Sequence, residues 1–244
     1  MSSFLAIYLR EMLLLKHRLK RQLLSMSVSP FLYLITFGFA LGGSVRVGGR
    51  EYLEFLIPGL IAMASMTQAF AISSEINSAR FYFHAFEEFQ AAPVSRLSFV
   101  LGETLAGLTR AFLAMTVVAV LGFLFGVRPH YGPFLFLAAF LNAFAFSSLA
   151  VALAMLVKTH ADQALLSNFV ITPMAFLGGT FFPLDAMPGW AQQILRFLPL
   201  THASRAIRTD AYGEPAQLAP YLILAACAAV FFVLALSTVS KARD

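Results

Sequence analysis

The sequence predicts an all-α membrane protein whose chain crosses the bilayer several times. Of its 244 residues, 59% are hydrophobic and only 12% are charged, whereas a soluble domain carries about 25% charged residues. The apolar residues fall into repeated runs of about 20, the length of one bilayer-crossing helix. Before the last run, residues 178–199 contain three prolines. Regular helix cannot pass through this region, because proline removes a backbone donor, so a partly re-entrant segment is expected there.

The N-terminal segment, residues 1–22, is predicted to be an amphipathic helix on the membrane surface, with its apolar residues on one face. A helix that simply extends the first span into the cytosol is the alternative. Five of the basic residues that produce the net charge of +5 lie here. They are Arg10, Lys16, Arg18, Lys20 and Arg21. Basic residues beside a first span set membrane orientation, so the charge indicates a lipid partner and no nucleic acid.

Six apolar runs are long enough to be membrane spans. They are residues 23–43, 55–76, 105–127, 134–157, 165–182 and 218–239. Basic residues are more numerous in the segments on the N-terminal side of the membrane than in those on the opposite side, which places both termini in the cytoplasm. The whole chain, residues 1–244, is therefore interpreted as one transmembrane domain.

Two connecting segments are long enough to carry structure of their own. The inner segment, residues 77–102, holds a short predicted helix that ends at Pro93, because proline disfavours helix for the residue before it. This helix either docks into a cytosolic partner or is a solvated connector. In the outer segment, residues 183–217, Trp190 suits the headgroup level of the bilayer. A second short helix is expected after Pro199, with Thr201 as its N-cap.

Several polar side chains fall within or beside the spans, where they are costly in lipid. Glu75, Glu103 and Arg110 lie near span ends, and the last two are seven residues apart, on roughly one helix face. They are either solvated at the interface, or they line a translocation path or helix contacts at its inner end. Deeper residues form interhelical hydrogen bonds or line a path. These are Gln68, Asn142 and Asn168.

The sequence contains no motif of a known catalytic or metal site. A nucleotide-binding P-loop, a His-Glu-x-x-His motif and a Gly-x-Ser-x-Gly motif are all missing. The single cysteine, Cys227, cannot form an intrachain disulfide. We therefore expect no catalytic residue, no metal and no cofactor in this chain. Three classes of membrane protein are compatible with this lack of catalytic motifs. The first is a membrane subunit of a larger transporter. An ion-coupled secondary transporter or channel is the alternative, followed by a polytopic membrane enzyme or a scaffold.

Four segments together carry a resemblance to a known family. They are Phe55–Leu60, Glu87–Val94, Thr172–Pro183 and Leu198–Leu200. In their order and spacing they resemble the type-2 ABC exporter permeases, in particular the group related to nodulation-factor and antibiotic exporters. The resemblance covers almost the whole chain. It implies an N-terminal interface helix, six transmembrane helices and two short re-entrant outer helices before the sixth, in a bacterial inner membrane.

The resemblance also implies partners and site residues. Such permeases pair into a dimer, here expected to be a homodimer, and associate with a cytosolic ABC ATPase that binds ATP and Mg²⁺. The short helix after the second span is their coupling helix, which contacts the ATPase. The residues expected to make this contact are Phe86, Glu87, Glu88 and Phe89, with Arg10, Lys16 and Arg18 as secondary candidates. The residues expected to shape the outer gate are Gly178, Gly179, Pro183 and Trp190.

Overall fold

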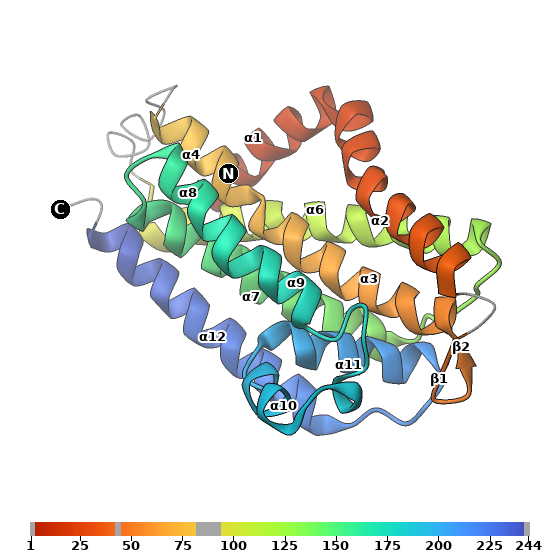
Figure 1. The fold of residues 1–244 in the computed structure, drawn as a ribbon. Coiled ribbons are helices and arrows are strands. Elements are labelled where there is room, and N and C mark those ends of the chain that lie inside the picture. Colours follow the sequence, from red (N-terminus) through yellow and green to blue (C-terminus); the bar gives the residue numbers. More distant parts are fainter. Residues whose placement is uncertain (1–2, 42–44, 82–93, 242–244) are drawn as a thin grey trace.

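A computed structural model describes residues 3–41, 45–81 and 94–241 of the chain, which form a helical bundle with one small hairpin (Figure 1). The first half contains α1 (Ser3–His17), α2 (Leu19–Leu41), β1 (Arg46–Val47), β2 (Arg50–Glu51), α3 (Tyr52–Phe70), α4 (Ile72–Phe81) and α6 (Arg96–Leu124). The second half contains α7 (Pro133–Leu156), α8 (His160–Leu166), η1 (Ser167–Ile171), α9 (Thr172–Leu177), η2 (Leu184–Ala186), α10 (Gly189–Leu195), α11 (Pro199–Ala211) and α12 (Leu218–Lys241).

We name the two ends of the bundle by the short helices that lie there. The α1 end contains α1, the end of α4 and the start of α8, and the last turn of α12 reaches it (Figure 1). The α11 end contains the hairpin, α10 and α11 (Figure 1). The long helices run between these ends.

Four helical stretches within the described residues are long and apolar enough to cross a membrane. They are Tyr52–Phe81 (α3 with α4), Arg96–Leu124 (α6), Pro133–Leu156 (α7) and Leu218–Lys241 (α12). Each overlaps one predicted span. The first predicted span overlaps α2, and the fifth is divided into α8, the π-helical turn η1 and α9. The apolar runs therefore located the helices, although several helices continue past the ends of their runs.

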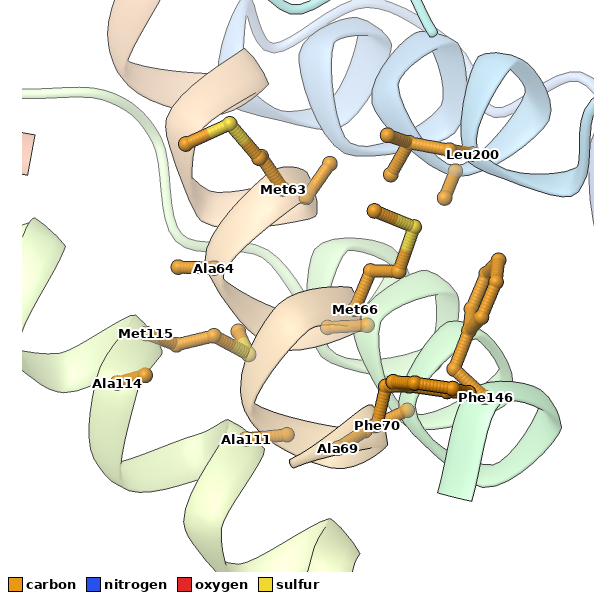
Figure 2. Packing of buried hydrophobic residues seen from close by; sticks show 14 of the residues in the cluster. Met63, Ala64, Met66, Ala69, Phe70, Ala111, Ala114, Met115, Phe146 and Leu200 are labelled. Atoms are coloured by element: carbon orange, nitrogen blue, oxygen red, sulfur yellow. The ribbon is translucent and has the colours of Figure 1, made fainter. Parts of the chain in front are cut away.

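Helix α3 forms the centre of the bundle. In its most apolar stretch 83% of the residues are buried, compared with 28% for α12. Figure 2 shows the side chain of Met66 of α3 directed toward Leu200 of α11 and Phe146 of α7. Alanines on both α3 and α6, such as Ala69 and Ala111, allow close approach of the two helices. Helix α12 instead lies outside, along α7 and α6, and its exposed side chains are almost all apolar, as lipid contact requires.

The N-terminal helix ends earlier than the sequence predicted. Helix α1 stops at His17 and α2 starts at Leu19, so Lys20 and Arg21 belong to α2. Helix α1 packs on the first turns of α6. Gly102 permits this contact, because a Cβ at this position would lie 2.8 Å from Ile7 of α1.

The α11 end contains the predicted short helices and an unpredicted hairpin. Gly48 and Gly49 connect β1 and β2 with φ angles of 59° and 81°, which a tight type I′ turn requires. Helices α10 and α11 occur where two short helices were expected. The prediction of Thr201 as an N-cap is wrong, because α11 starts at Pro199 and the Thr201 hydroxyl donates to the Leu195 carbonyl at 2.7 Å.

Candidate functional site

A buried ionic cluster joins three helices at the α1 end. Arg110 of α6 donates from Nη1 to Oε1 of Glu75 on α4 at 3.2 Å, and its Nη2 lies 3.7 Å from Oε2 of Glu11 on α1. The side chains of Arg110 and Glu11 are each 3% exposed, whereas that of Glu75 is 28% exposed. We call Glu11, Glu75 and Arg110 the ionic cluster. One guanidinium thus holds carboxylates from two other helices.

Two more charged residues adjoin the ionic cluster. Arg10 donates from Nη1 to Oε1 of Glu11 at 3.3 Å. Glu103 lies two helical turns before Arg110 in α6 and is 2% exposed. Its Oε2 accepts no hydrogen bond from any described residue. Burial raises the pKa of Glu11 above its ordinary value, and the nearby Arg10 and Arg110 only partly oppose this effect. Three carboxyl groups, those of Glu11, Glu75 and Glu103, thus lie near two arginines, Arg10 and Arg110.

The position of the cluster links it to the predicted coupling segment. Helix α4 ends at Phe81 and α6 begins at Arg96, so the cluster ties together the two helices that flank this segment and joins both to α1. The predicted contact residues themselves lie outside the described residues. They are Phe86, Glu87, Glu88 and Phe89. Any displacement of the flanking helices relative to α1 must stretch or exchange these ionic contacts.

The secondary contact candidates differ in their exposure. Lys16 and Arg18 are exposed at the α1 end, and Arg10 is half-buried. A cavity of about 450 Å³ lies between α1 and α4, and Arg10, Arg18 and Glu75 line it. The α1 end therefore presents both charge signs to the space beside the ionic cluster.

The structure changes the interpretation of the polar residues near the span ends. Solvation at the interface fits Glu75, but Glu103 and Arg110 are buried among helices. Glu11 was missed by the sequence reasoning. Its signal was present, because Ile7, Glu11 and Leu15 share one face at four-residue spacing and that face is the buried one.

The three deeper polar residues lie in different surroundings. Asn142 of α7 is fully buried and donates to the Ala62 carbonyl and to Ser65 Oγ of α3, at 3.2 and 2.8 Å. Gln68 of α3 instead borders a cavity of about 250 Å³ between α2, α3, η1 and α9. Asn168 is exposed on η1. Neither Gln68 nor Asn168 has a side-chain hydrogen bond to another described residue.

At the α11 end, an arginine fixes the predicted gate region to α3. Arg208 of α11 donates to the Phe55 carbonyl at 3.2 and 3.3 Å and to the Gly179 carbonyl at 2.9 Å, and its guanidinium lies 3.8 Å above the Phe55 ring. The Tyr52 hydroxyl donates to the Phe181 carbonyl at 2.8 Å. These contacts hold residues 179–181 against the first turns of α3. Sequence reasoning did not find Arg208.

The glycines of this region permit the tight packing. Gly179 has a φ angle of 78°, in the left-handed region that glycine adopts most easily. A Cβ on Gly178 would lie 2.7 Å from Leu200, and one on Gly59 of α3 would lie 2.6 Å from the Thr180 carbonyl. The two remaining predicted gate residues are less enclosed. Pro183 is half-buried, and Trp190 is 69% exposed at the start of α10.

The sequence of residues 2–212 matches a family model described as ABC-2 type transporter. The chain belongs to this family. Its fold agrees with membership, because the described residues are mostly helical and include four stretches long and apolar enough to cross a membrane. Among those residues, no group of three His, Cys, Asp or Glu side chains is placed to hold a metal ion.

Curated relatives match this ABC-2 permease over most of its length. Nodulation protein J of Rhizobium leguminosarum bv. viciae is 31% identical over 221 residues, covering 87% of this chain and 83% of that protein. The inner membrane transport permease YadH of Escherichia coli (strain K12) is 29% identical over 238 residues, covering 93% and 92%. The daunorubicin resistance ABC transporter permease protein DrrB1 of Streptomyces coeruleorubidus is 26% identical over 240 residues, covering 96% and 84%. The predicted resemblance is confirmed: the chain is an integral membrane permease of ABC-type transport.

Proposed function

We propose that this chain is the membrane-spanning subunit of an ATP-driven exporter, which forms a translocation path as a dimer and is driven by separate cytosolic ATPase subunits. The match to the ABC-2 family over residues 2–212 carries this proposal. Permease subunits of ABC transporters are generally non-catalytic, and ATP and Mg²⁺ would bind the partner ATPase.

The proposal assigns six spans and an orientation. Four are the long apolar stretches, and α2 and the α8–η1–α9 series complete the set. The α1 end would face the cytoplasm of a bacterial inner membrane, with both termini on that side, because the exposed basic residues Lys16, Arg18, Lys20 and Arg21 gather there. Helix α1 would lie along the membrane surface, and the α11 end would face outward.

The distribution of polar side chains supports a dimer-formed path. On α2, Ser25, Ser29 and Thr36 are exposed among apolar side chains such as Leu32, and Asn168 and Thr172 are exposed on η1 and α9. The cavity that Gln68 borders lies between these elements. The exposed residues of α12 from Leu218 to Leu234 are all apolar. Polar groups at membrane depth face protein or a water-filled space, so the α2 and α9 face is where a second copy would pack.

Force from the ATPase would enter through the segment between α4 and α6. Closure of the paired ATPases would push on Glu87, Glu88 and their aromatic neighbours. Because the ionic cluster ties α4 and α6 to α1, these three helices would move together or exchange partners. The coupling needs an ATPase whose contact free energy differs between the two states of the permease.

Co-purification with a candidate cytosolic ABC ATPase from the same organism tests the proposal. The tagged complex is measured for assembly and for ATP hydrolysis in nanodiscs, with and without the double change Glu88→Lys and Phe89→Ala. We expect the double variant to lose most of the bound ATPase. A matched control, Glu214→Lys with Phe197→Ala, changes an exposed acid and an exposed aromatic near the α11 end and should assemble normally.

The remaining outcomes discriminate between the functional classes. If the variant with Glu88→Lys and Phe89→Ala assembled normally, the exporter proposal would stand, and the ATPase would be inferred to dock at α1 instead. If folded permease bound no ATPase, the exporter proposal would fail. An ion gradient that drives transport without ATP would then favour a secondary carrier.

A further inference from the structure

A chain of buried amides connects α4 to α8 at the α1 end. Asn77 Nδ2 donates to Gln163 Oε1 at 3.0 Å, and Gln163 Nε2 donates to Ser73 Oγ at 2.8 Å. Ser73 in turn donates to the Phe70 carbonyl at 2.7 Å. Asn77 is 0% and Gln163 is 3% exposed. One side chain of α8 thus bonds two successive turns of α4.

Further contacts fix the end of α4 to α7 and to α8. Arg80 donates from Nη1 to the Ala154 carbonyl of α7, and the rings of Phe81 and His160 meet edge to face with centroids 5.5 Å apart. The start of α8 is itself fixed by a capping box, in which Thr159 and Asp162 satisfy each other's backbone donors. The last turns of α4 are therefore bound to α8. The same turns precede the segment that is proposed to contact the ATPase.

Helix α8 leads toward the α11 end through an irregular backbone. The π-helical turn η1 follows at Ser167–Ile171, and Pro173 stands in the first turn of α9. π-helical turns interrupt the regular hydrogen bonding of a helix and often occur at functional sites. Helix α9 then reaches Gly178 and Gly179, which Arg208 and Ser204 hold by their carbonyls. Helix α8, η1 and α9 are thus continuous in the chain between the buried amides and residues 178–179.

The buried amides make independent movement of α4 and α8 costly. Separating them would leave both amides without partners in an apolar interior, which costs more than the net value of the hydrogen bond itself. In addition, Asn77 Oδ1 accepts no hydrogen bond from any described residue. A buried acceptor without a donor is rare. A second arrangement of α8 that supplied a donor to Asn77 Oδ1 would therefore be stabilised.

We infer that Asn77 and Gln163 are positioning residues that transmit movement of α4 to the fifth span. The inference rests on the proposed function, because it is the ATPase that would displace α4. It adds a second route to the one through α6 and α1. Through Gln163, movement of α4 would displace α8 and α9, which border the α2 and α9 face. Through the ionic cluster, the same movement would displace α1.

The test measures movement of the fifth span rather than transport of an unidentified cargo. In a Cys227→Ser background, Asn168→Cys places a thiol on exposed η1. The rate of its reaction with a water-soluble maleimide is measured in the nanodisc complex, without nucleotide and with ATP plus vanadate. We expect the trapped complex to change this rate at least about five-fold. Asn77→Leu with Gln163→Leu should keep ATP hydrolysis within about two-fold of the parent but abolish the change.

Two further variants separate positioning from stability. Asn142→Leu removes an equally buried amide between α7 and α3 and should leave the nucleotide-dependent change intact. The exchange Asn77→Gln with Gln163→Asn keeps one amide on each helix and should restore the change, even if the leucine pair folds poorly.

Each result has a definite reading. A leucine pair, or a single Gln163→Leu variant, that responds to nucleotide like the parent would overturn the inference and leave the exporter intact. A parent complex that hydrolyses ATP but shows no rate change at residue 168 would overturn it as well. Absence of ATPase binding to the folded parent would refute the proposed function itself.

Discussion

Replacing Arg110 by methionine removes the cation that Glu11 and Glu75 share and leaves most of the side-chain volume in place. Glu11 is 3% exposed, and among the described residues it then keeps Arg10 as its charged partner, so its carboxylate loses most of its compensation. Removing one partner of a buried ion pair costs about 3–5 kcal/mol. The side chain of Glu75 is 28% exposed, so water can solvate its carboxylate and its loss of Arg110 costs less. We therefore expect a destabilisation in the lower part of this range.

Thermal stability of the detergent-solubilised permease measures this cost. For a chain of this length, 1 kcal/mol shifts the midpoint by about 2–4 °C, so Arg110→Met should lower Tm by roughly 6–12 °C near neutral pH. Arg128→Met is the control, because Arg128 is exposed and only stacks 5.0 Å from the Phe123 ring, a contact worth about 0.5–1 kcal/mol.

A compensating variant sharpens the prediction. Adding Glu11→Gln to Arg110→Met removes the uncompensated buried charge, so it should recover at least half of the lost Tm, as replacing a whole buried ion pair is often nearly neutral. Equal Tm losses for Arg110→Met and Arg128→Met would refute the reasoning. So would a double variant less stable than Arg110→Met alone.

Two further predictions concern the opposite end and the pH. Arg208→Lys should lower Tm by several degrees, because one ammonium cannot replace the planar guanidinium on two carbonyls and a ring, whereas Arg205→Lys, exposed on the same helix, should change it little. Burial raises the pKa of Glu11 above 4.5, so the folded state binds its proton more tightly than the unfolded state does. Stability should therefore fall as the pH rises from 4.5 through the raised pKa, and less steeply in Glu11→Gln; parallel Tm curves for the two proteins would contradict this.

The helices could be predicted from the sequence because apolar runs require burial in lipid or protein. Their ends could not, because local polar contacts decide them. Helix α6 begins at Arg96, where the Ser95 side chain accepts a hydrogen bond from the Ser98 backbone, well before the apolar run starts. Conversely, the predicted fifth span contains a π-helical turn, which no composition signal marks.

The candidate site was only partly predictable for a different reason. Glu75, Glu103 and Arg110 stand out because charges are rare in apolar runs. Glu11 has only its spacing from Ile7 and Leu15 to mark it, and its pairing with Arg110 joins residues far apart in the chain. Arg208 lies in a polar connecting segment, where an arginine is ordinary until its carbonyl partners are known. Such sites are recognised by contacts between helices and not by spacing along one of them.

The two ends of the bundle are held by different kinds of contact, and this difference bears on how the permease moves. At the α11 end, Arg208 and Tyr52 donate to backbone carbonyls, whose positions change only if the chain itself is rearranged. At the α1 end, Arg110 meets long carboxylate side chains on two other helices, which can exchange partners while each backbone stays intact. We therefore expect α3 and α11 to move as one body and the α1 end to adjust around it. Force applied between α4 and α6 would then tilt this body rather than open the α11 end locally.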